Sequence, residues 1–462
     1  MKRFLCISLS ICLLLSLCGC FGPKEDPDAL RVGFGRVDVT PEISVGLGGY
    51  GNAETRRSRG VVDPLYITCI AITEAGETVL MLTADTLGLG RGLLSTFRTF
   101  VSSATGIAQD KIFVGAIHTH SAPDLSVGDD QCNTYKEQFY TGAAKAALAA
   151  LEDQSPATLR ATTTNVPGMN FVRHYKMAND SYAGSNFGSF TGTTPVDYAT
   201  ETDPQMVLVQ FERTGTKKDI LMMNWQAHPD WSSDIGTALV SSSFVGPARS
   251  KLEQCSGMLV AYFTGASGNQ NPESRISADM HRLNWRNYGE ALADYALKAL
   301  TDLKAVEGSG IETQQSKVIV EVDHSWDHMI IEANEVFTVW KTQSKAAGDA
   351  LGRTYGFSSS YQARAIRTRS GMFPSEQMEL NVCRVGGIGF VMGTYEMFSD
   401  AGLYIKRNSP FDITFIITGN HTYIPSAAAY DYRSYESDTG LYAKGTAEKL
   451  ADEFVSMLNA VQ

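Results

Sequence analysis

The sequence predicts an α/β fold in which mixed β-sheets are flanked by helices, built as a single large catalytic domain. Short apolar runs rich in β-branched residues alternate along the chain with amphipathic segments of helical spacing, a pattern typical of that class. The 462 residues are 43% hydrophobic and 19% charged, which is ordinary for a globular protein with a large core. Length alone would also allow two or three domains.

Five apolar runs, each ending in polar residues, predict buried strands. They are residues 78–85, 111–120, 206–211, 219–228 and 257–265. Three further segments predict helices, namely 140–153, which is alanine-rich, 284–303 and 447–460. The residues expected on buried faces are Tyr288, Leu292, Tyr295 and Ala299 in the second helix, and Ala447, Leu450, Ala451, Phe454 and Leu458 in the third.

Two segments between these elements differ in composition from the rest. Residues 178–200 are rich in Gly, Ser and Thr, and they predict a long loop that would serve as a lid or a substrate rim. A brief change of composition at 306–320 predicts a joint between subdomains.

The first thirty residues predict a targeting segment. A short basic start precedes an apolar stretch from Phe4 to Leu17, which is too short to span a bilayer and is typical of a signal peptide. The stretch ends in Leu-Cys-Gly-Cys, which resembles the bacterial lipobox and makes Cys20 the expected lipidation site. We therefore expect a lipoprotein signal peptide at 1–20, a tether at 21–30 and the catalytic domain at 31–462. A plain secretory signal is the alternative.

This segment also predicts where the protein works. The mature chain should lie outside the cytoplasm, as a cell-envelope lipoprotein held to a membrane through its N-terminal lipid anchor, or as a secreted protein. Nucleic acid is not an expected partner, because the net charge is −11 and no basic run reaches five residues. Beyond the signal, the widely spaced Cys69, Cys132, Cys255 and Cys383 are expected to be buried apolar residues, with a single disulfide as the alternative.

Histidines follow two of the predicted strands. His118 and His120 end the run 111–120, and His228 ends the run 219–228. Ligands of α/β sheets bind at the carboxyl ends of strands, and neutral imidazole is a usual zinc ligand. Each histidine alone would more often be a hydrogen-bonded core or rim residue. A rival pair, His324 and His328, has helical spacing, but a solvated face or turn is the favoured interpretation.

Three more motifs have both a structural and a functional interpretation. Residues 268–274, "GNQNPES", predict a tight turn, whose backbone N–H groups would also suit an oxyanion. Glu396 follows an apolar run and is either the acid of a helix N-terminus or a ligand. The tyrosines between 423 and 435 are either rim packing or part of a site.

Taken together and in order, these motifs resemble the neutral/alkaline non-lysosomal ceramidases. The resemblance starts with "VGFGRVDVTPE" at 32–42 and "GLGGYG" at 46–51, and it continues through "HTHSAP", "NWQAHP", "GNQNP", "YEMFSDAGLYIK" and "TYIPSAAAY" to about residue 460. The opening motif and "HTHSAP" are the most specific. The Ig-like C-terminal domain of full-length relatives has no counterpart in these 462 residues.

The resemblance implies one Zn²⁺ per chain and a set of site residues. Motif by motif, the metal ligands fall on His118, His228, Glu396 and Tyr423. Tyr435 would assist the substrate carbonyl, and His120 would act in the second sphere or in proton transfer. Arg173 and Asn170, both in "NFVRHYK", would line the substrate pocket, and Asn271 takes a catalytic place in the turn motif.

The implied activity is hydrolysis of the amide bond of an N-acyl (sphingo)lipid or a related small amide by zinc-activated water. Relatives carry Ser where this chain has Asn271, which excludes a serine nucleophile here but not the zinc mechanism. Ser243 likewise stands where relatives often have Asp. The alternatives are a ceramidase-like binding protein with weak or no catalysis, and an esterase or other hydrolase using the same zinc. The acyl length, true substrate, oligomeric state and membrane leaflet do not follow from the sequence.

Overall fold

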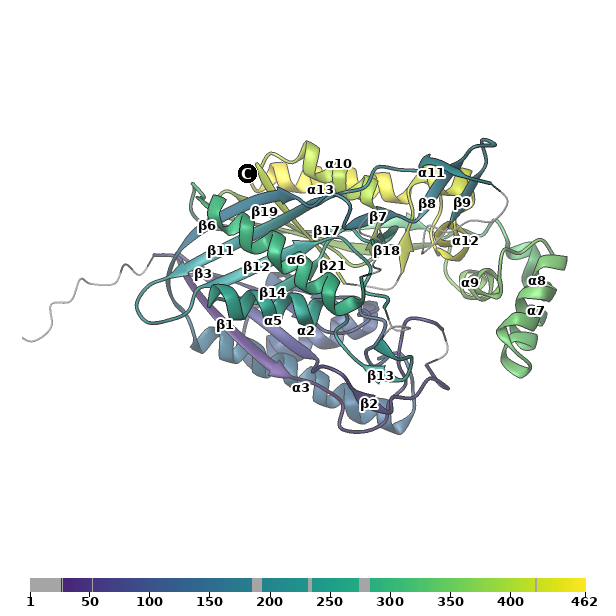
Figure 1. Cartoon of the computed structure of the whole chain (residues 1–462), viewed down its shortest axis with the longest axis horizontal. Helices are drawn as coiled ribbons and strands as arrows, with labels where there is room; N and C mark the ends of the chain where they lie inside the picture. Colours follow the sequence, from purple (N-terminus) through teal and green to yellow (C-terminus); the bar gives the residue numbers. More distant parts are fainter. Residues whose placement is uncertain are drawn as a thin grey trace, which may run out of the picture.

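The computed structural model describes residues 26, 28–51, 53–184, 193–231, 235–273, 283–419 and 422–462, and it arranges them in four layers (Figure 1). Two β-sheets lie face to face in the middle, and helices cover the outer face of each. The predicted α/β class with mixed sheets and flanking helices is confirmed. The predicted signal at 1–20, with Cys20, lies outside the described residues, as does most of the tether at 21–30.

The larger sheet has nine strands whose spatial order departs from chain order. Most neighbours run antiparallel, whereas the pairs β4–β5 and β12–β14 are parallel. The strands in sheet order are β14 (Leu259–Thr264), β12 (Ile220–Trp225), β11 (Gln205–Arg213), β6 (Ser155–Asn165), β1 (Arg31–Asp38), β3 (Tyr66–Glu74), β4 (Glu77–Ala84) and β5 (Ile112–Ala116), with β16 (Lys304–Ala305) paired to β6.

The second sheet has four strands, β17 (Ile311–Glu321), β18 (Ser375–Val385), β19 (Ile388–Gly393) and β21 (Ile413–Thr418). Its last two strands run parallel to each other. Apolar side chains from both sheets fill the space between them, and Phe263 of the larger sheet meets Phe415 of the smaller one edge to face at 5.5 Å between ring centroids. Burial of these alternating apolar faces is the main source of stability for the body.

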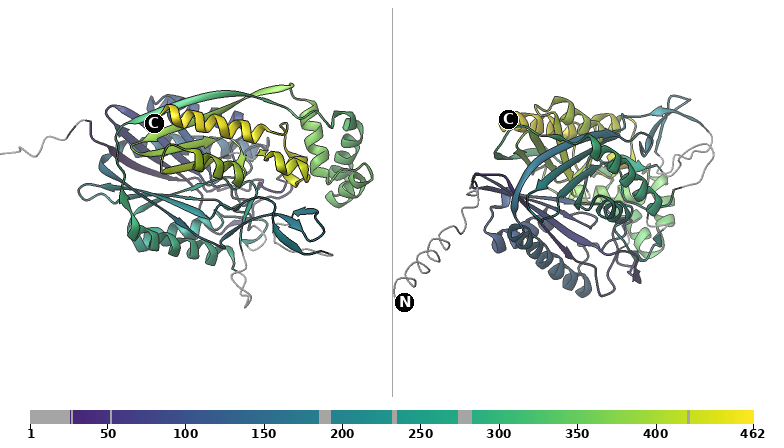
Figure 2. Two further views of the ribbon diagram at one scale, coloured as in Figure 1. Left: turned by 90° about the horizontal axis from the view of Figure 1, so that it is seen from above. Right: turned by 60° about the vertical axis from the view of Figure 1, so that its left-hand side comes forward.

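Helices cover the outer faces of both sheets (Figure 2). One of them, α3, packs close to β1 because Gly35 leaves room: a Cβ there would lie 2.0 Å from the carbonyl oxygen of Ala146. The helices on the larger sheet are α2 (Arg91–Thr105), α3 (Asp130–Glu152), α5 (Val245–Ser256) and α6 (Trp285–Ala299). Those on the smaller sheet are α10 (Ser399–Asn408) and α13 (Thr446–Ala460).

A helical insertion between β17 and β18 stands apart from the layers, at the right of Figure 1. It has a small core of its own built around Ala333, Val336 and Ile366. Its elements are η3 (Asp327–Met329), α7 (Ile330–Thr342), α8 (Lys345–Thr354) and α9 (Ser360–Ser370).

The remaining elements are short. They are β2 (Gly60–Val61) with β13 (Leu239–Val240), β7 (Asn170–Val172) with β15 (Gln270–Pro272), β8 (His174–Met177) with β9 (Tyr182–Gly184) and β10 (Pro195–Tyr198), β20 (Glu396–Met397) with β22 (Tyr423–Ile424), η1 (Gln109–Lys111), η2 (Leu300–Asp302), α11 (Ala427–Asp431) and α12 (Tyr435–Thr439).

All five predicted strands and all three predicted helices exist, but several bounds differ. The strand predicted over 111–120 stops at Ala116, so its histidines lie in the loop beyond. The helix predicted from 140 begins at Asp130. Asp129 caps it, because its side chain accepts a hydrogen bond from the backbone N–H of Cys132. The helix predicted over 284–303 ends at Ala299 and passes into a 3₁₀ turn.

Three further sequence expectations need correction. Tyr295 is exposed, and Ala296 occupies the buried position instead. An α-helix has 3.6 residues per turn, so residue 296, four after Leu292, lies on the buried face. The loop predicted over 178–200 contains β9 and β10, while 185–192 lie outside the described residues. Cys255 is exposed rather than buried, and all four cysteines beyond the signal are free, so the disulfide alternative is wrong.

Two other expectations can be compared with the structure. The buried face predicted for the last helix is confirmed at all five positions, from Ala447 to Leu458. The composition change at 306–320 falls where the chain enters the long edge strand β17 of the second sheet. Within the described part of the chain, no helix is both long enough and apolar enough to cross a membrane.

Candidate metal centre and active site

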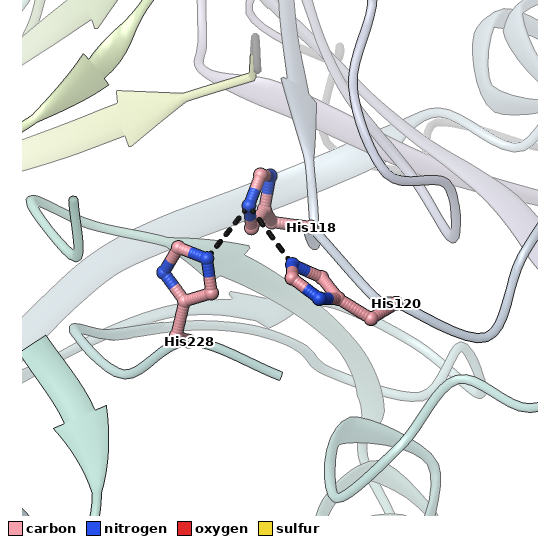
Figure 3. A group of neighbouring side chains, drawn as sticks. All are labelled: His118, His120 and His228. Atoms are coloured by element: carbon pink, nitrogen blue, oxygen red, sulfur yellow. Dashed lines mark hydrogen bonds between the residues drawn. The ribbon is translucent and has the colours of Figure 1, made fainter. Parts of the chain in front are cut away.

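Three histidines meet beyond the ends of strands that are far apart in sequence (Figure 3). His118 and His120 follow β5, and His228 follows β12. All three are buried, and one nitrogen of each lies within 4.8 Å of the others. The strand-end positions predicted from sequence are therefore neighbours in space.

His118 is held in an uncommon backbone conformation. Its φ is +67°, in the left-handed region that non-glycine residues seldom adopt and that clusters at functional sites. Its Nδ1 lies 2.7 Å from the carbonyl oxygen of Leu87. A carbonyl oxygen only accepts, so Nδ1 carries a proton, and in the neutral form of the ring the lone pair of Nε2 is directed toward the cluster.

His228 is oriented in the same way. Its Nδ1 lies 3.2 Å from the carbonyl oxygen of Ser267, which again leaves the lone pair on Nε2. The Nε2 atoms of His118 and His228 are 3.0 Å apart, and Nε2 of His120 lies 3.4 Å from that of His118 (Figure 3). Two zinc-bound nitrogens in tetrahedral geometry, each about 2.0–2.1 Å from the ion, lie about 3.3 Å apart.

A cation between these nitrogens resolves an otherwise unfavourable contact. Two lone pairs facing each other at 3.0 Å repel unless a proton or a metal lies between them. Burial, together with the charges of His118 and Arg173, lowers the pKa of His228 well below its ordinary value. Burial and the charge of His118 lower the pKa of His120 likewise. The donor set fits a divalent metal of the zinc type.

A carboxylate and a phenol complete the cluster. Glu396 and Tyr423 are paired partners in the two-residue parallel bridge of β20 with β22, which extends the second sheet toward the histidines. Oε2 of Glu396 is 3.3 Å from Nε2 of His118 and 3.8 Å from Nε2 of His228, and no hydrogen bond to it is found among the described residues. Burial raises the pKa of this carboxyl well above its ordinary value, a cost that a bound cation would remove.

Two glycines of the sequence motifs make this convergence sterically possible. A Cβ on Gly49, where φ is +109°, would lie 2.6 Å from the ring of His120. A Cβ on Gly268 would lie 2.8 Å from the carbonyl oxygen of Glu396. Both glycines therefore let backbone approach a site residue more closely than any other amino acid would allow.

Arg173 lies behind the cluster as a buried, fully engaged cation. Its guanidinium donates to Oε1 of Glu436 at 2.7 Å, to Oδ1 of Asn271 at 3.1 Å and to the hydroxyl oxygen of Tyr423 at 3.2 Å. Burial alone would raise the pKa of Glu436, but the charges of His174 and Arg173 lower it to about 2. This network fixes the orientation of Tyr423 and buries Asn271 within the protein.

The front of the cluster opens into a cavity of about 320 Å³. His118, His120, Glu396 and Tyr423 line it, and so does Tyr435, whose ring meets that of Tyr423 edge to face at 6.1 Å between centroids. Burial raises the pKa of Tyr435 to about 12, although 45% of the residue's surface is exposed, so its hydroxyl remains a hydrogen-bond donor at neutral pH. The site therefore combines a candidate metal-binding group with a hydrogen-bond donor in one cavity.

The structure brings most of the sequence-predicted site residues together. His118, His228, Glu396 and Tyr423, the four expected ligands, form one group, and His120 lies close enough to be a fifth. Asn170 is different, because its amide nitrogen donates to the carbonyl oxygens of Asp203 and Gln226 and it does not line the cavity. Arg173 also lies behind the lining rather than in it. The roles of these residues remain predictions.

The rival histidines do not join the cluster. Nδ1 of His324 pairs with Asp327 at 2.8 Å, and the His328 ring stacks on Trp326, as expected for a solvated turn. Sequence reasoning missed Tyr361 and Arg364 of α9, which also line the cavity, and the buried Glu436. The signal available for α9 was a cluster of arginines in "QARAIRTRS", and its distance from the other motifs gave no reason to link them.

Comparisons with known proteins agree with this geometry. The family model described as "Neutral/alkaline non-lysosomal ceramidase, N-terminal" matches residues 30–265, just over half of the chain. The chain belongs to this family. The matched part includes His118, His120 and His228, whereas Glu396, Tyr423 and Tyr435 of this ceramidase-family protein lie beyond it.

Two solved structures share the fold of this ceramidase-family chain. Neutral ceramidase from Pseudomonas aeruginosa matches with a TM-score of 0.70 and 16% identity, over 94% of this chain and 75% of that one. A ceramidase complexed with C2 matches with a TM-score of 0.68, also at 16% identity over 94% and 75% of the two chains. The search of curated protein sequences returned no match. Family and fold together imply a hydrolase.

Proposed function

We propose that this protein is a zinc-dependent amidohydrolase that cleaves the amide bond of an N-acyl lipid or a related small amide. One observation carries the proposal. The Nε2 lone pairs of His118 and His228 face each other at 3.0 Å, and the unpartnered Oε2 of Glu396 lies 3.3 Å from the first of them. A divalent cation placed between these atoms would satisfy all three at once.

The proposed ligands are His118, His228, Glu396 and Tyr423. Zinc held there would lower the pKa of a bound water to about 7 and polarise the substrate carbonyl. The protein's own groups would do the rest. The Leu87 and Ser267 carbonyls keep both imidazoles in the tautomer that binds metal, and Arg173 holds the hydroxyl of Tyr423 in place.

Two residues at the cavity would act on the substrate. The Tyr435 hydroxyl is protonated and would donate to the carbonyl oxygen as it gains negative charge. His120 would carry a proton from the attacking water to the leaving nitrogen, since one of its ring nitrogens faces the cluster. Water adds to the carbonyl carbon, the C–N bond breaks, and the products are a carboxylic acid and an amine. Asn271 would support this set by holding Arg173, not by attacking the substrate.

The test combines metal content with a substrate panel. Protein purified with zinc should hold one zinc per chain and release fatty acid from fluorescent ceramide or from short N-acyl amides. The double variant His118→Ala/His228→Ala should lose both, whereas His328→Ala, whose ring lies outside the cluster, should keep both. Zinc binding with cleavage of esters but no amide would favour the esterase alternative. A protein that holds zinc and cleaves neither would be a binding protein.

We further propose that the chain works outside the cytoplasm, held at a membrane by a lipid on Cys20. The support is the lipobox-like Leu-Cys-Gly-Cys sequence after a short apolar stretch. Metabolic labelling with an alkyne fatty acid should mark the wild-type protein and not Cys20→Ser. Equal labelling of both would contradict the proposed anchor, and unlabelled protein in the medium would favour plain secretion.

A further inference from the structure

The cavity at the candidate metal centre is small and its lining is mostly polar. Its volume of about 320 Å³ is at the lower end of the range of roughly 300–1,000 Å³ for small-molecule sites. The aliphatic side chains in its lining are Leu87, Ala365 and Leu441, which come from three separate segments of the chain. The lining therefore favours a polar group beside the scissile bond.

One wall of the cavity is built by the helical insertion. Tyr361, Arg364, Ala365 and Thr368 of α9 all line it, together with the candidate metal ligands His118, Glu396 and Tyr423. The helix is tied to the rest of the site because the Tyr361 hydroxyl donates to the carbonyl oxygen of Tyr50 at 2.8 Å. The insertion is thus a fixed part of the pocket.

Arg364 differs from most of the other cations of the insertion. The Lys341, Lys345 and Arg369 side chains pair with Glu54, Asp349 and Asp323 respectively, and Arg367 donates to Asn334. Across the described ranges, no carboxylate pairs with the Arg364 guanidinium, which instead lies 5.3 Å from the ring centroid of Tyr361 and 5.8 Å from that of Trp340.

These aromatic contacts orient the guanidinium without neutralising it. Stacking on aromatic faces restricts an arginine while leaving its N–H fork available to a planar anion. Gly51 also leaves space for it, since a Cβ there would lie 3.0 Å from a guanidinium nitrogen of Arg364. Asp124 is an acidic residue of the same lining. Its Oδ1 already accepts hydrogen bonds from the backbone N–H of Ser126 at 2.9 Å and from the Ser126 hydroxyl at 2.5 Å.

We propose that Arg364 is a specificity residue that binds an anionic group on the substrate, so that the preferred substrates are N-acyl conjugates carrying a carboxylate or sulfonate close to the amide. This inference rests on the proposed function, because it names the substrate class of the same cavity. Bidentate, charge-assisted hydrogen bonds from arginine to such a group are among the strongest polar contacts in proteins. A neutral ceramide offers Arg364 no such partner.

Binding is measured first, so that the result does not depend on catalysis. Hexanesulfonyl-glycine and hexanesulfonyl-glycinamide carry a sulfonamide in place of the cleavable amide, and they differ only in the terminal charge. By calorimetry, the protein should bind the carboxylate about tenfold or more tightly than the carboxamide, as expected for a charge-assisted pair. Arg364→Gln should abolish that preference, and Arg364→Lys should keep part of it, because a lysine retains the charge and loses the fork.

The matched control is Arg367→Gln, which removes a guanidinium from the same helix but from a side chain engaged by Asn334. It should leave the preference unchanged. Hydrolysis is then compared for N-hexanoyl-glycine, N-hexanoyl-taurine, N-hexanoyl-glycinamide and a short-chain ceramide, and the two anionic substrates should have the higher kcat/KM. The kcat/KM values for N-hexanoyl-glycine and N-hexanoyl-taurine show whether the site fits a carboxylate or a sulfonate better.

The two proposals fail in different ways. Equal affinity of the wild type for carboxylate and carboxamide, or a preference that persists in Arg364→Gln, would overturn the role of Arg364 whatever the protein hydrolyses. A charge preference that depends on Arg364, found together with no cleavage of any amide, would support the anion subsite and overturn the proposed amidohydrolase activity.

Discussion

Replacing Glu436 by Gln tests the buried network that supports the site. Glu436 is fully buried, and its two carboxylate oxygens meet the Arg173 guanidinium and Nε2 of His174, both at 2.7 Å. Glutamine has the same shape but no negative charge. The change therefore leaves the buried Arg173 without its principal counter-ion.

The expected size of the effect follows from proton linkage. The pKa of Glu436 falls from an ordinary 4.5 to about 2, a difference of about 2.5, in the folded protein. At about 1.4 kcal/mol for each tenfold change in acidity, the charged form contributes roughly 3 kcal/mol to the free energy of unfolding. Breaking one side of a buried ion pair costs about 3–5 kcal/mol in general, which agrees.

The pH dependence has a definite sign. Because the folded-state pKa is lowered, the contribution of Glu436 is fully present above about pH 4.5 and disappears as the pH falls toward 2. Urea unfolding of metal-free wild type and Glu436→Gln should therefore differ by about 3 kcal/mol at pH 7 and by far less near pH 2.5. Asp180→Asn, which alters an exposed ion pair with Lys176, is the control and should change little.

Either of two results would refute this reasoning. A difference below about 1 kcal/mol at pH 7 would mean that the carboxylate is not needed to hold Arg173. A large difference that stays constant down to pH 2.5 would mean that shape or packing, and not charge, accounts for the loss.

Four further outcomes follow from single contacts. Tyr435→Phe should lower kcat on amide substrates by about 10²-fold with little change in KM, because one donor to the developing charge is lost; an unchanged kcat would remove Tyr435 from the mechanism. Gly35→Ala should destabilise the fold by about 1–3 kcal/mol in urea unfolding, since its Cβ would collide with the backbone of α3. Gly49→Ala should displace the ring of His120 and weaken activity while the far-ultraviolet circular dichroism stays that of the wild type. Cys255 should react with a thiol reagent in the native state, whereas the other three cysteines beyond the signal should react only after unfolding.

Local pattern predicted part of each covering layer and part of the larger sheet. Apolar runs located the strands at the two ends of that sheet, whereas β6, β1 and β3 between them and the four strands of the second sheet were not predicted. The 3.6-residue spacing gave five of the seven buried positions of α13. Tyr295 shows the limit of that method, because the next residue, Ala296, sits closer to the centre of the buried face. Strand ends were also misjudged, since β5 leaves the sheet at Ala116, two residues before His118 takes up a positive φ.

The site was predictable only where motif and topology coincide. His118 and His228 follow strands of one sheet, so their meeting could be argued from sheet geometry. Glu396 and Tyr423 come from the separate short pair of strands β20 and β22, and only the resemblance to a family connected them with the histidines. Nothing in the sequence indicated that α9 would bring Arg364 to the same cavity, because the insertion packs there through tertiary contacts such as that of Tyr361 with Tyr50.

The most direct test of the central claim is anomalous X-ray diffraction from crystals grown with zinc, measured on both sides of the zinc absorption edge. The account predicts one strong peak within bonding distance, about 2.0–2.2 Å, of Nε2 of His118, Nε2 of His228 and a carboxylate oxygen of Glu396. Zinc found elsewhere on the protein, with these three side chains in contact and no ion between them, would contradict it.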